Sequence, residues 1–579
     1  MSNGQRAWLV SMSLISVCIA TVFYLNPSVG FANADACDAW YFFGIYKSYS
    51  NIASLFPSAY QISRFPALLP WIYLAPHLSV IAFHDAKFWT YTLLTAAAFA
   101  YAAIKLFGPR IGPFVAVLFS CSTLVIGVFS HDYVTGAGLF WETGAIAATL
   151  YGASRTNQVL GAITTGVFYA LAFWTHVPTA MFIFAVPLFF FAVSSRPQPL
   201  GSFVRFNLLG LLGFVATTLA FCILSWSIGG PFQFYMSELM GGLAVGYSYA
   251  RGISDKWLWF RVDTNIALFF AAIGVSVSVL TRAVIVRDVN RTTILPALVF
   301  LPAALVCFGW EFSGHTVLQG NVYAPWMYPV AFLACGAGLA AAPRLNAAVM
   351  IAITVLSVAV LGVVASKASF QPPVGLRFVA AALVVVACAS AVWRYSGILI
   401  SASLVGLICI TYPSGGYGYE PWLHSVRNDR ELYEQMEAAH EFILVNYRAR
   451  PVFWISATQG ALPDARLISG TFLECSVPAS FPSATRLNSG WDRLYPDLSS
   501  KVSSGEIKAG QRLFIISQGQ NLADRARNSL SSLGLVGRPV VEAAISPEIS
   551  IAAIDIERDQ EGNKPQAGAP PVHGFDVKP

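Results

Sequence analysis

The chain has 579 residues, of which 56% are hydrophobic and only 11% are charged, and its net charge is +6. Because soluble globular proteins carry about 25% charged residues, this composition excludes a soluble protein and indicates a membrane protein with many spans. The basic residues are spread over short loops between apolar segments, which is typical of charge that orients a membrane protein. No nucleic-acid partner is therefore predicted.

Apolar stretches long enough to cross a bilayer recur along residues 1–412. A span needs about 18 apolar residues or more, and about thirteen segments meet that requirement. With bounds loose by several residues, they are 7–27, 82–107, 111–130, 136–153, 157–175, 178–194, 206–228, 262–282, 293–312, 323–342, 346–366, 374–392 and 395–412. The expected fold of this part is an all-α polytopic membrane bundle.

The distribution of Lys and Arg predicts how the bundle is oriented. With the N-terminus inside, the inside loops hold most of the basic residues, whereas the short connections "SHDYVTG", "THVPTA" and "EFSGHTVLQGN" on the outside hold none. Longer outside loops contain exceptions such as Lys47 and Arg64, but the rule is weaker in long loops. The pattern predicts a cytoplasmic N-terminus, and an odd number of spans places the C-terminus outside.

The composition changes near residue 413, after which the chain is typical of a soluble domain. The segments "PVFWISA", "RLFIIS" and "ISIAAIDI" are predicted strands, and "NLADRARNSLSSLG" is a predicted helix that ends at a glycine cap. Residues 413–560 are therefore expected to form a small extracytoplasmic α/β domain. Residues 561–579 are rich in Gly and Pro and are expected to be disordered.

Polar residues that could take part in catalysis or binding gather in the outside connections, above all in the first one at 28–81. The candidates are Asp35, Asp38 and Arg64 in that loop, His131, Asp132 and Tyr133 in the second connection, His176 in the third, and His315, Gln319, Asn321 and Tyr323 in the fifth. Glu142 lies inside a predicted span, where a carboxylate must face protein or water. Any active site is therefore expected to open to the outside face.

Each candidate also has a structural interpretation. Two acids outside a membrane are usually solvated, Arg64 could anchor the chain at the interface, and His176 before Val-Pro could be a turn residue. The histidines and acids on this face permit a divalent metal, but no HxxxH or DxD spacing specifies one, so no metal is predicted and the cofactor stays unknown. Cys37 and Cys475 both fall on the predicted outside, where a disulfide between them would persist.

The order of these features resembles the polytopic GT-C glycosyltransferases, and within them the bacterial relatives of protein O-mannosyltransferases and aminoarabinose transferases. The resemblance rests on "NADACDAWYFFG" after the first span, on "SRFP" at the end of the long loop, on "HDY" and on "QGNVYAPWMYP". The last resembles an R-Y-x-x-P-x-x-P stretch in these enzymes. Here Asn321 or Gln319 takes the place of the arginine, which leaves a phosphate-binding role there in doubt.

The resemblance implies a sugar donor carried on a polyprenyl phosphate, an acceptor that approaches from outside a bacterial inner membrane, and inversion at the anomeric carbon. A first-loop carboxylate would be the general base, with Asp38 aligning better than Asp35. Arg64 would contact the lipid phosphate, helped by His131 or His176, and Asp132 would position the acceptor or a metal. The acceptor, whether glycan, lipid or protein, is not specified.

Two alternatives stay open at this stage. A transporter or flippase for a lipid-linked or small substrate has a similar number of spans, although the sequence contains no visible internal repeat. A cell-envelope polymer ligase or polymerase would share the outside site and differ in its substrate. Loss of sugar transfer on changing Asp35 and Asp38 would favour the glycosyltransferase over both a transporter and a non-catalytic subunit.

Overall fold

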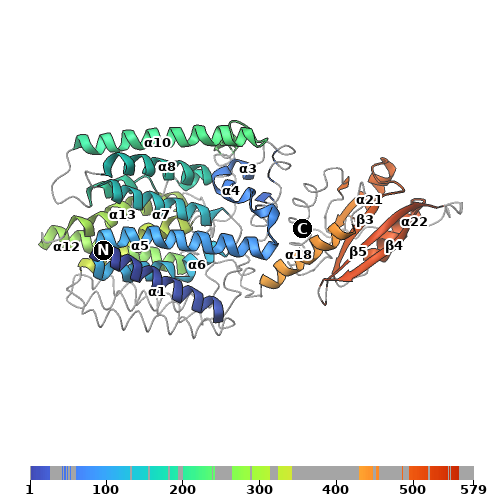
Figure 1. The fold of residues 1–579 in the computed structure, drawn as a ribbon, viewed down its shortest axis with the longest axis horizontal. Coiled ribbons are helices and arrows are strands. Elements are labelled where there is room, and N and C mark those ends of the chain that lie inside the picture. Colours follow the sequence, from blue (N-terminus) through green and yellow to red (C-terminus); the bar gives the residue numbers. More distant parts are fainter. Residues whose placement is uncertain are drawn as a thin grey trace. The chain divides into compact units, whose positions relative to one another are not determined.

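The computed structural model describes residues 2–25, 42, 45–46, 49, 53, 60–130, 134–153, 157–179, 183–192, 200–237, 239–240, 264–286, 290–312, 324–341, 429–446, 452–455, 485–486, 494–518, 522–545, 547 and 549–559. The chain divides into two compact units, Met1–Glu431 and Leu432–Pro579. The first is helical and the second is built around a β-sheet (Figure 1).

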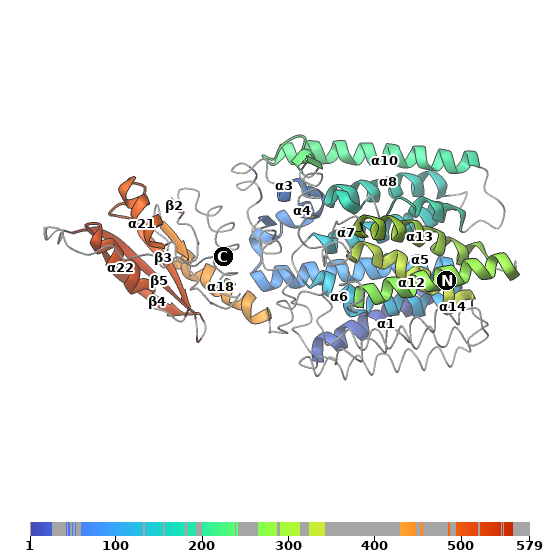
Figure 2. The same ribbon diagram turned by 180° about the vertical axis from the view of Figure 1, so that it is seen from behind.

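The described part of the helical unit is a bundle of long apolar helices. Its α-helices are α1 (Asn3–Leu25), α3 (Tyr60–Ser63), α4 (Phe65–Ile72), α5 (Val80–Ser120), α6 (Thr123–Phe129), α7 (Thr135–Gly152), α8 (Gln158–Thr175), α10 (Leu200–Ser227), α12 (Thr264–Val286), α13 (Arg291–Phe312) and α14 (Tyr328–Ala341). Short 3₁₀ helices are η2 (Ala75–His77), η4 (Val177–Thr179), η5 (Val186–Phe191) and η8 (Ala324–Met327). Helices α12, α13 and α14 pack together, and α14 also packs on α5 (Figure 2).

Five helices within the described ranges are long and apolar enough to cross a membrane: Ile81–Ser120, Gln158–Thr175, Leu200–Ser227, Arg291–Gly309 and Ala324–Ala341. The chain is an integral membrane protein. The predicted spans at 346–366, 374–392 and 395–412 lie outside the described residues, so the predicted number of helices stays a prediction.

Helix α5 is a hairpin of two arms, because the chain reverses at Gly108. Gly108 has φ 79° and ψ 177°, a conformation that glycine adopts without strain. A side chain at Gly112 would lie 2.5 Å from the Cα of Ile104, so the arms touch at their backbones. Further along, the rings of Phe99 and Phe119 stack at 3.8 Å. The turn separates the spans predicted at 82–107 and 111–130, but the second arm ends at Ser120 and α6 follows after a break.

The expectation of one membrane span at 178–194 is wrong for the residues described there. That part of the chain forms the short helices η4 and η5, and it packs its apolar residues Val186, Phe189 and Phe190 into the protein. Pro178 and Pro187 stand in the first turns of η4 and η5, the position where proline is best tolerated at a helix start.

Helices α7, α8 and α10 approach one another closely through glycines. A Cβ at Gly161 would lie 2.2 Å from the Cα of Gly152, and one at Gly166 would lie 1.8 Å from the carbonyl oxygen of Gly210. Close contact through small residues is typical of helix association in membranes, where hydrocarbon offers no competing hydrophobic gain. Because Gly152 ends α7 and Gly161 lies near the start of α8, the two helices run antiparallel, and the start of α7 therefore lies near the end of α8.

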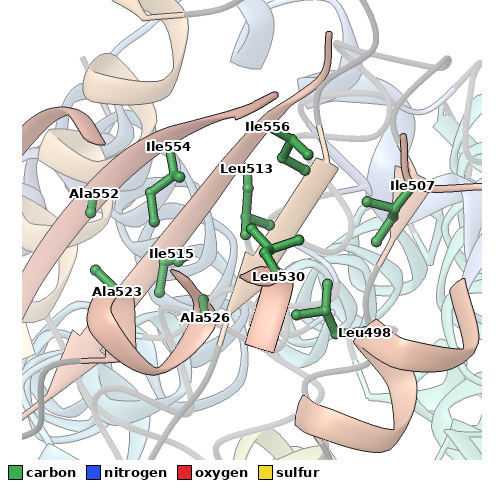
Figure 3. Close-up of a cluster of buried hydrophobic side chains, with 10 residues drawn as sticks. All are labelled: Leu498, Ile507, Leu513, Ile515, Ala523, Ala526, Leu530, Ala552, Ile554 and Ile556. Carbon is green, nitrogen blue, oxygen red and sulfur yellow. The ribbon is translucent and has the colours of Figure 1, made fainter. Parts of the chain in front are cut away.

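The second unit contains a mixed sheet with strand order β2-β1-β3-β5-β4. Its strands are β1 (Val452–Ile455), β2 (Thr485–Arg486), β3 (Arg512–Gln518), β4 (Leu535–Ala544) and β5 (Ile549–Arg558), and its helices are α18 (Asp429–Val445), α21 (Leu494–Ser503) and α22 (Leu522–Ser532). Strands β1, β2 and β3 run parallel, while β5 is antiparallel to both β3 and β4. Figure 3 shows the core, in which Leu513, Ile515, Ile554 and Leu530 are buried together.

A buried ion pair ties α18 to the sheet. The Arg512 guanidinium donates to both carboxylate oxygens of Asp555, at 2.7 and 3.0 Å, and its remaining nitrogen donates to the carbonyl of Asn446 at 2.8 Å. A bidentate pair of this kind fixes orientation as well as charge. Arg512 therefore has a structural role in this unit.

Candidate functional site

The first loop docks onto the helical unit through one face of aromatic and apolar residues. Phe42, Ile45, Tyr46, Tyr49 and Ala53 are all helical and buried, and their spacing is that of a single helix face. Tyr46 lies 5.3 Å from Phe83 and Tyr49 lies 5.4 Å from Phe65, measured between ring centroids. Burial raises the pKa of Tyr49 to about 12, so its phenol keeps its proton near neutral pH.

Arg64 is held in the interior at the start of α4, where the sequence predicted a candidate. It occupies the position before the first helical residue, and Pro66 follows in the first turn, where proline is well tolerated. Only 4% of Arg64 is exposed, and its guanidinium carbon lies 5.5 Å from the centre of the Phe42 ring. Contact with a ring face stabilises a cation without cancelling its charge.

Lys87 is a second buried cation next to the same loop. Helix α5 begins after Ser79, whose hydroxyl accepts a hydrogen bond from the Ala82 N–H at 3.1 Å. Two turns later the Lys87 ammonium lies 5.2 Å from the Tyr46 ring and 5.9 Å from the Phe83 ring, and the residue is 3% exposed. His84, one turn before Lys87, is fully buried as well.

Sequence reasoning missed Lys87 and His84, although a signal was present. The stretch "FHDAKF" places three ionisable residues at the beginning of the predicted span 82–107. Ionisable residues inside a membrane segment are costly, and they mark functional sites for that reason. The same rule singled out Glu142 and should have singled out these residues too.

The arrangement brings two cations against neighbouring rings of one segment. Phe42 and Tyr46 are four residues apart, which is about one helical turn. Arg64 and Lys87 therefore contact rings that lie one turn apart in the first loop. Buried cations strongly favour an anion, since electrostatic attraction grows as water is excluded. A phosphate is the anion for which an arginine and a lysine together are best suited.

His176 lies at the end of α8 in a turn that the following residues stabilise. Its backbone N–H donates to the carbonyl of Ala172 at 3.2 Å, and its own carbonyl accepts from the Thr179 N–H at 2.9 Å. The Thr179 hydroxyl also donates to Ala172 at 3.1 Å. These backbone contacts shape the turn, and the buried His176 ring lies 6.2 Å from that of Trp326.

Glu142 is fully buried on α7. Neither of its carboxylate oxygens has a hydrogen-bond partner among the residues that the structure describes. Its neighbour is Tyr169, whose hydroxyl donates to the carbonyl of Ile183 at 2.6 Å. One turn earlier, Gly138 makes room for Trp326, since a side chain there would lie 1.6 Å from the indole. Glu142 therefore belongs to the packed interior around Trp326.

The other candidates predicted from sequence lie outside the described residues. They are Asp35, Asp38, His131, Asp132, Tyr133, His315, Gln319, Asn321 and Tyr323, together with the cysteines Cys37 and Cys475. In the part of the chain that is described, no three His, Cys, Asp or Glu side chains gather into a group that could hold a metal ion.

Comparison with known proteins identifies the fold. The apo structure of ArnT from Cupriavidus metallidurans is similar over 95% of this chain and 98% of its own, with a TM-score of 0.50 and 14% sequence identity. The chain has the ArnT fold. The resemblance to GT-C aminoarabinose transferases that the sequence suggested is thus confirmed at the level of fold.

Further matches are weaker. ArnT bound to undecaprenyl phosphate matches 94% of this chain and 98% of its own, with 14% identity and a TM-score of 0.47. The Archaeoglobus fulgidus oligosaccharyltransferase, tethered to an acceptor peptide, matches 88% of this chain and 69% of its own, with 12% identity and a TM-score of 0.37. No protein-family model and no curated protein matches the sequence.

Proposed function

We propose that this chain is an integral-membrane glycosyltransferase that transfers a sugar from a polyprenyl phosphate to an acceptor on the extracytoplasmic side. The observation that carries the proposal is the burial of Arg64 and Lys87 against the aromatic residues of the first loop. The similarity to the fold of ArnT supports it. ArnT itself has been solved with undecaprenyl phosphate bound.

The two cations suit the leaving group of such a reaction. A lipid phosphate is already charged when it departs, so it requires positive groups around its oxygens and no proton from an acid. The planar guanidinium of Arg64 can donate two parallel hydrogen bonds to a phosphate, and the ammonium of Lys87 can act as a compact second charge. Both groups are held by aromatic packing, so little reorganisation is needed when the phosphate binds.

The general base in this proposal is Asp38, with Asp35 as the second candidate. Asp38 comes four residues before Phe42, and four residues of chain span at most about 14 Å. Asp35 comes seven residues before Phe42, and its reach extends to about 25 Å. Asp38 therefore has the shorter tether to the ring that contacts Arg64, which favours it as the first candidate. A base near the phosphate site can take the acceptor's proton while the anomeric carbon inverts.

The proposed orientation places the N-terminus in the cytoplasm and the first loop, the site and the second unit outside. The asymmetry of Lys and Arg between the connections supports this orientation. A cysteine introduced at exposed Arg538 in the second unit should react with a membrane-impermeant maleimide in intact cells. Reaction only after the cells are opened would contradict the orientation.

Sugar transfer tests the proposal directly. Purified protein in lipid nanodiscs is given a panel of undecaprenyl-phosphate-linked sugars with a radiolabelled sugar, together with lipid, glycan and peptide acceptors. We expect label to move to an acceptor with release of undecaprenyl phosphate, and we expect the Asp35→Asn, Asp38→Asn double variant to lose this transfer. Normal transfer by the double variant would overturn the carboxylate base, and lipid flipping without consumption of any donor would overturn the transferase.

A further inference from the structure

Helix α4 is tied to helix α5 by a buried hydrogen bond between two aromatic side chains. The Trp71 indole N–H donates to the Tyr91 hydroxyl at 2.9 Å, across 20 residues of sequence. Both residues are 5% exposed, and their rings meet edge to face with centroids 5.7 Å apart. The Phe140 ring of α7 lies 6.2 Å from that of Tyr91. A buried indole N–H needs a partner, so this bond fixes the direction in which Trp71 faces.

Trp71 lies along the part of α5 that carries Lys87. Besides its contact with Tyr91, its ring lies 5.8 Å from that of Phe83 and meets it at 85°. Phe83 comes one turn before Lys87 and Tyr91 comes one turn after it, so the three share a face of the helix. Phe83 and Tyr91 are eight residues apart, which is about 12 Å along the helix axis. The indole bridges that distance and lies at the level of Lys87.

Trp71 also belongs to the helix that begins at Arg64. Arg64 is the residue before α4, and its carbonyl accepts a hydrogen bond from the Ala67 N–H at 3.0 Å. Trp71 follows seven residues after Arg64, which is about 10 Å of helix. Helix α4 has only 8 residues, and isolated helices shorter than about 12 residues are marginally stable at best. Its place relative to α5 therefore depends on contacts such as that of Trp71 with Tyr91.

We propose that Trp71 and Tyr91 are positioning residues, which hold Arg64 and Lys87 at the separation that one phosphate requires. Arg64 moves with α4 and Lys87 moves with α5, and the indole–phenol hydrogen bond joins these two helices. A phosphate that is bound by both cations requires them at a fixed distance, and a misplacement of about 1 Å can cost about 10²-fold in rate. Trp71 and Tyr91 act through the cations and need not touch the donor. The inference rests on the proposed function, because the phosphate is that of the proposed donor.

Another indole–hydroxyl hydrogen bond between helices supplies the matched control. The Trp174 indole on α8 donates to the Thr218 hydroxyl on α10 at 2.8 Å. Thr218→Val removes this acceptor as Tyr91→Phe removes the other, and each variant leaves an indole N–H without its partner. The control bond does not join α4 to α5. Thr218→Val therefore reproduces the loss of a hydrogen bond between helices without changing the separation of Arg64 and Lys87.

Binding of undecaprenyl phosphate to the full-length protein in nanodiscs tests the inference. Tyr91→Phe should weaken binding about tenfold, an effect within the range for residues that act in one network, whereas Thr218→Val should bind like the wild type. The same measurements are then made in the Lys87→Ala background. With one cation removed there is no separation left to hold, so Tyr91→Phe should have no further effect there. Trp71→Phe, which removes the donor of the bond, should repeat both results from the side of α4.

An equal loss of binding from Tyr91→Phe in the wild-type and Lys87→Ala backgrounds would overturn the inference, because the hydroxyl would then act on the fold as a whole. Unchanged binding by both Tyr91→Phe and Trp71→Phe would overturn it as well. Thermal midpoints should fall by similar amounts in Tyr91→Phe and Thr218→Val, and unfolding of Tyr91→Phe alone would show a purely structural role. If the wild type itself does not bind undecaprenyl phosphate, the proposed donor fails, and no variant is needed to see it.

Discussion

Two arginines of this protein are equally buried, but they have different surroundings. Arg512 in the second unit and Arg64 in the helical unit are each 4% exposed. Arg512 donates to both oxygens of Asp555 and to the carbonyl of Asn446. Arg64 lies against the face of Phe42, which belongs to the loop that carries Asp35 and Asp38. The environment of Arg512 explains its burial as part of the fold.

The difference teaches how to interpret buried charge. Burying a cation costs several kcal/mol unless other groups compensate it, and a bidentate carboxylate is one complete form of compensation. An aromatic face stabilises a cation by about 0.5–2 kcal/mol. We therefore expect Arg512 to serve stability, whereas the proposed function gives Arg64 and Lys87 a role in binding phosphate. The experiments below separate the two roles by measuring activity and stability on the same variants.

The largest effect is expected at the proposed base. Asp38→Asn should lower sugar transfer by about 10²–10⁴-fold, because an amide cannot accept the acceptor's proton. Asp35→Asn should lower it less, since its chain tether is longer. Thermal unfolding of both variants should match the wild type. A greater loss of transfer in Asp35→Asn than in Asp38→Asn would reverse the assignment of the base.

The second effect concerns stability alone. Arg512→Ala should destabilise the second unit by about 3–5 kcal/mol, because Asp555, in a mostly buried position, would lose both hydrogen bonds and the charge of Arg512. Arg538→Ala is the matched control: its pair with Glu557 is 3.8 Å long and exposed, and such pairs contribute at most about 1 kcal/mol. The free energy of unfolding of both variants is measured in urea, with hydrogen exchange of strands β3 and β5 as the readout. Equal unfolding midpoints for the two variants would remove the structural role of Arg512.

The third effect should be on transfer activity and not on stability. Arg64→Ala and Lys87→Ala should each lower transfer by about 10²–10³-fold, in proportion to the loss of one donor to the departing phosphate. Lys105→Ala is a close control, because Lys105 lies on the same helix and its ammonium also contacts a tyrosine ring, that of Tyr101, at 5.6 Å. We expect that control to retain activity. If Arg64→Ala unfolded the protein as Arg512→Ala unfolds the second unit, the contrast between the two arginines would fail.

The smallest effect is expected at Glu142. Its carboxylate oxygens have no hydrogen-bond partner among the described residues, so a neutral side chain of the same shape should cost nothing. Glu142→Gln should leave the thermal midpoint unchanged or raise it slightly, and we expect full transfer activity. A tenfold loss of transfer at unchanged stability would show that Glu142 takes part in function.

Composition and periodicity predicted much of the fold. Apolar runs located the helix that carries Glu142, and the apolar alternation of "ISIAAIDI" located β5. The short helices α3 and α4 on either side of Arg64 were not predicted, because they fall in residues 28–81, which were expected to form the first external loop. Strand β4 was missed because it is an exposed edge strand that contains Gly537 and Pro539, so it has no apolar pattern. The span predicted at 178–194 failed because its apolar residues Val186, Phe189 and Phe190 pack inside the protein, and hydropathy does not distinguish such a segment from one that crosses the membrane.

The candidate site was predictable only in part. Arg64 was found as a polar residue of the first outside connection, the resemblance implied its contact with a phosphate, and its burial could not be derived from spacing. Lys87 was overlooked because "FHDAKF" opens an apolar span and contributes no motif of its own. Its relation to Arg64 depends on how the first loop folds over α5, and that contact joins residues far apart in the sequence. Pattern analysis cannot supply a contact of this kind.

Binding of undecaprenyl phosphate is the most direct measurement of the central claim. The wild type, the Arg64→Ala, Lys87→Ala double variant and the Lys105→Ala, Arg110→Ala control are compared in nanodiscs by microscale thermophoresis, with undecaprenol as the uncharged competitor. The account predicts that the double variant loses affinity for the phosphate at least 100-fold, while the control binds like the wild type and undecaprenol does not compete. Equal affinity in the double variant and the wild type would contradict the account.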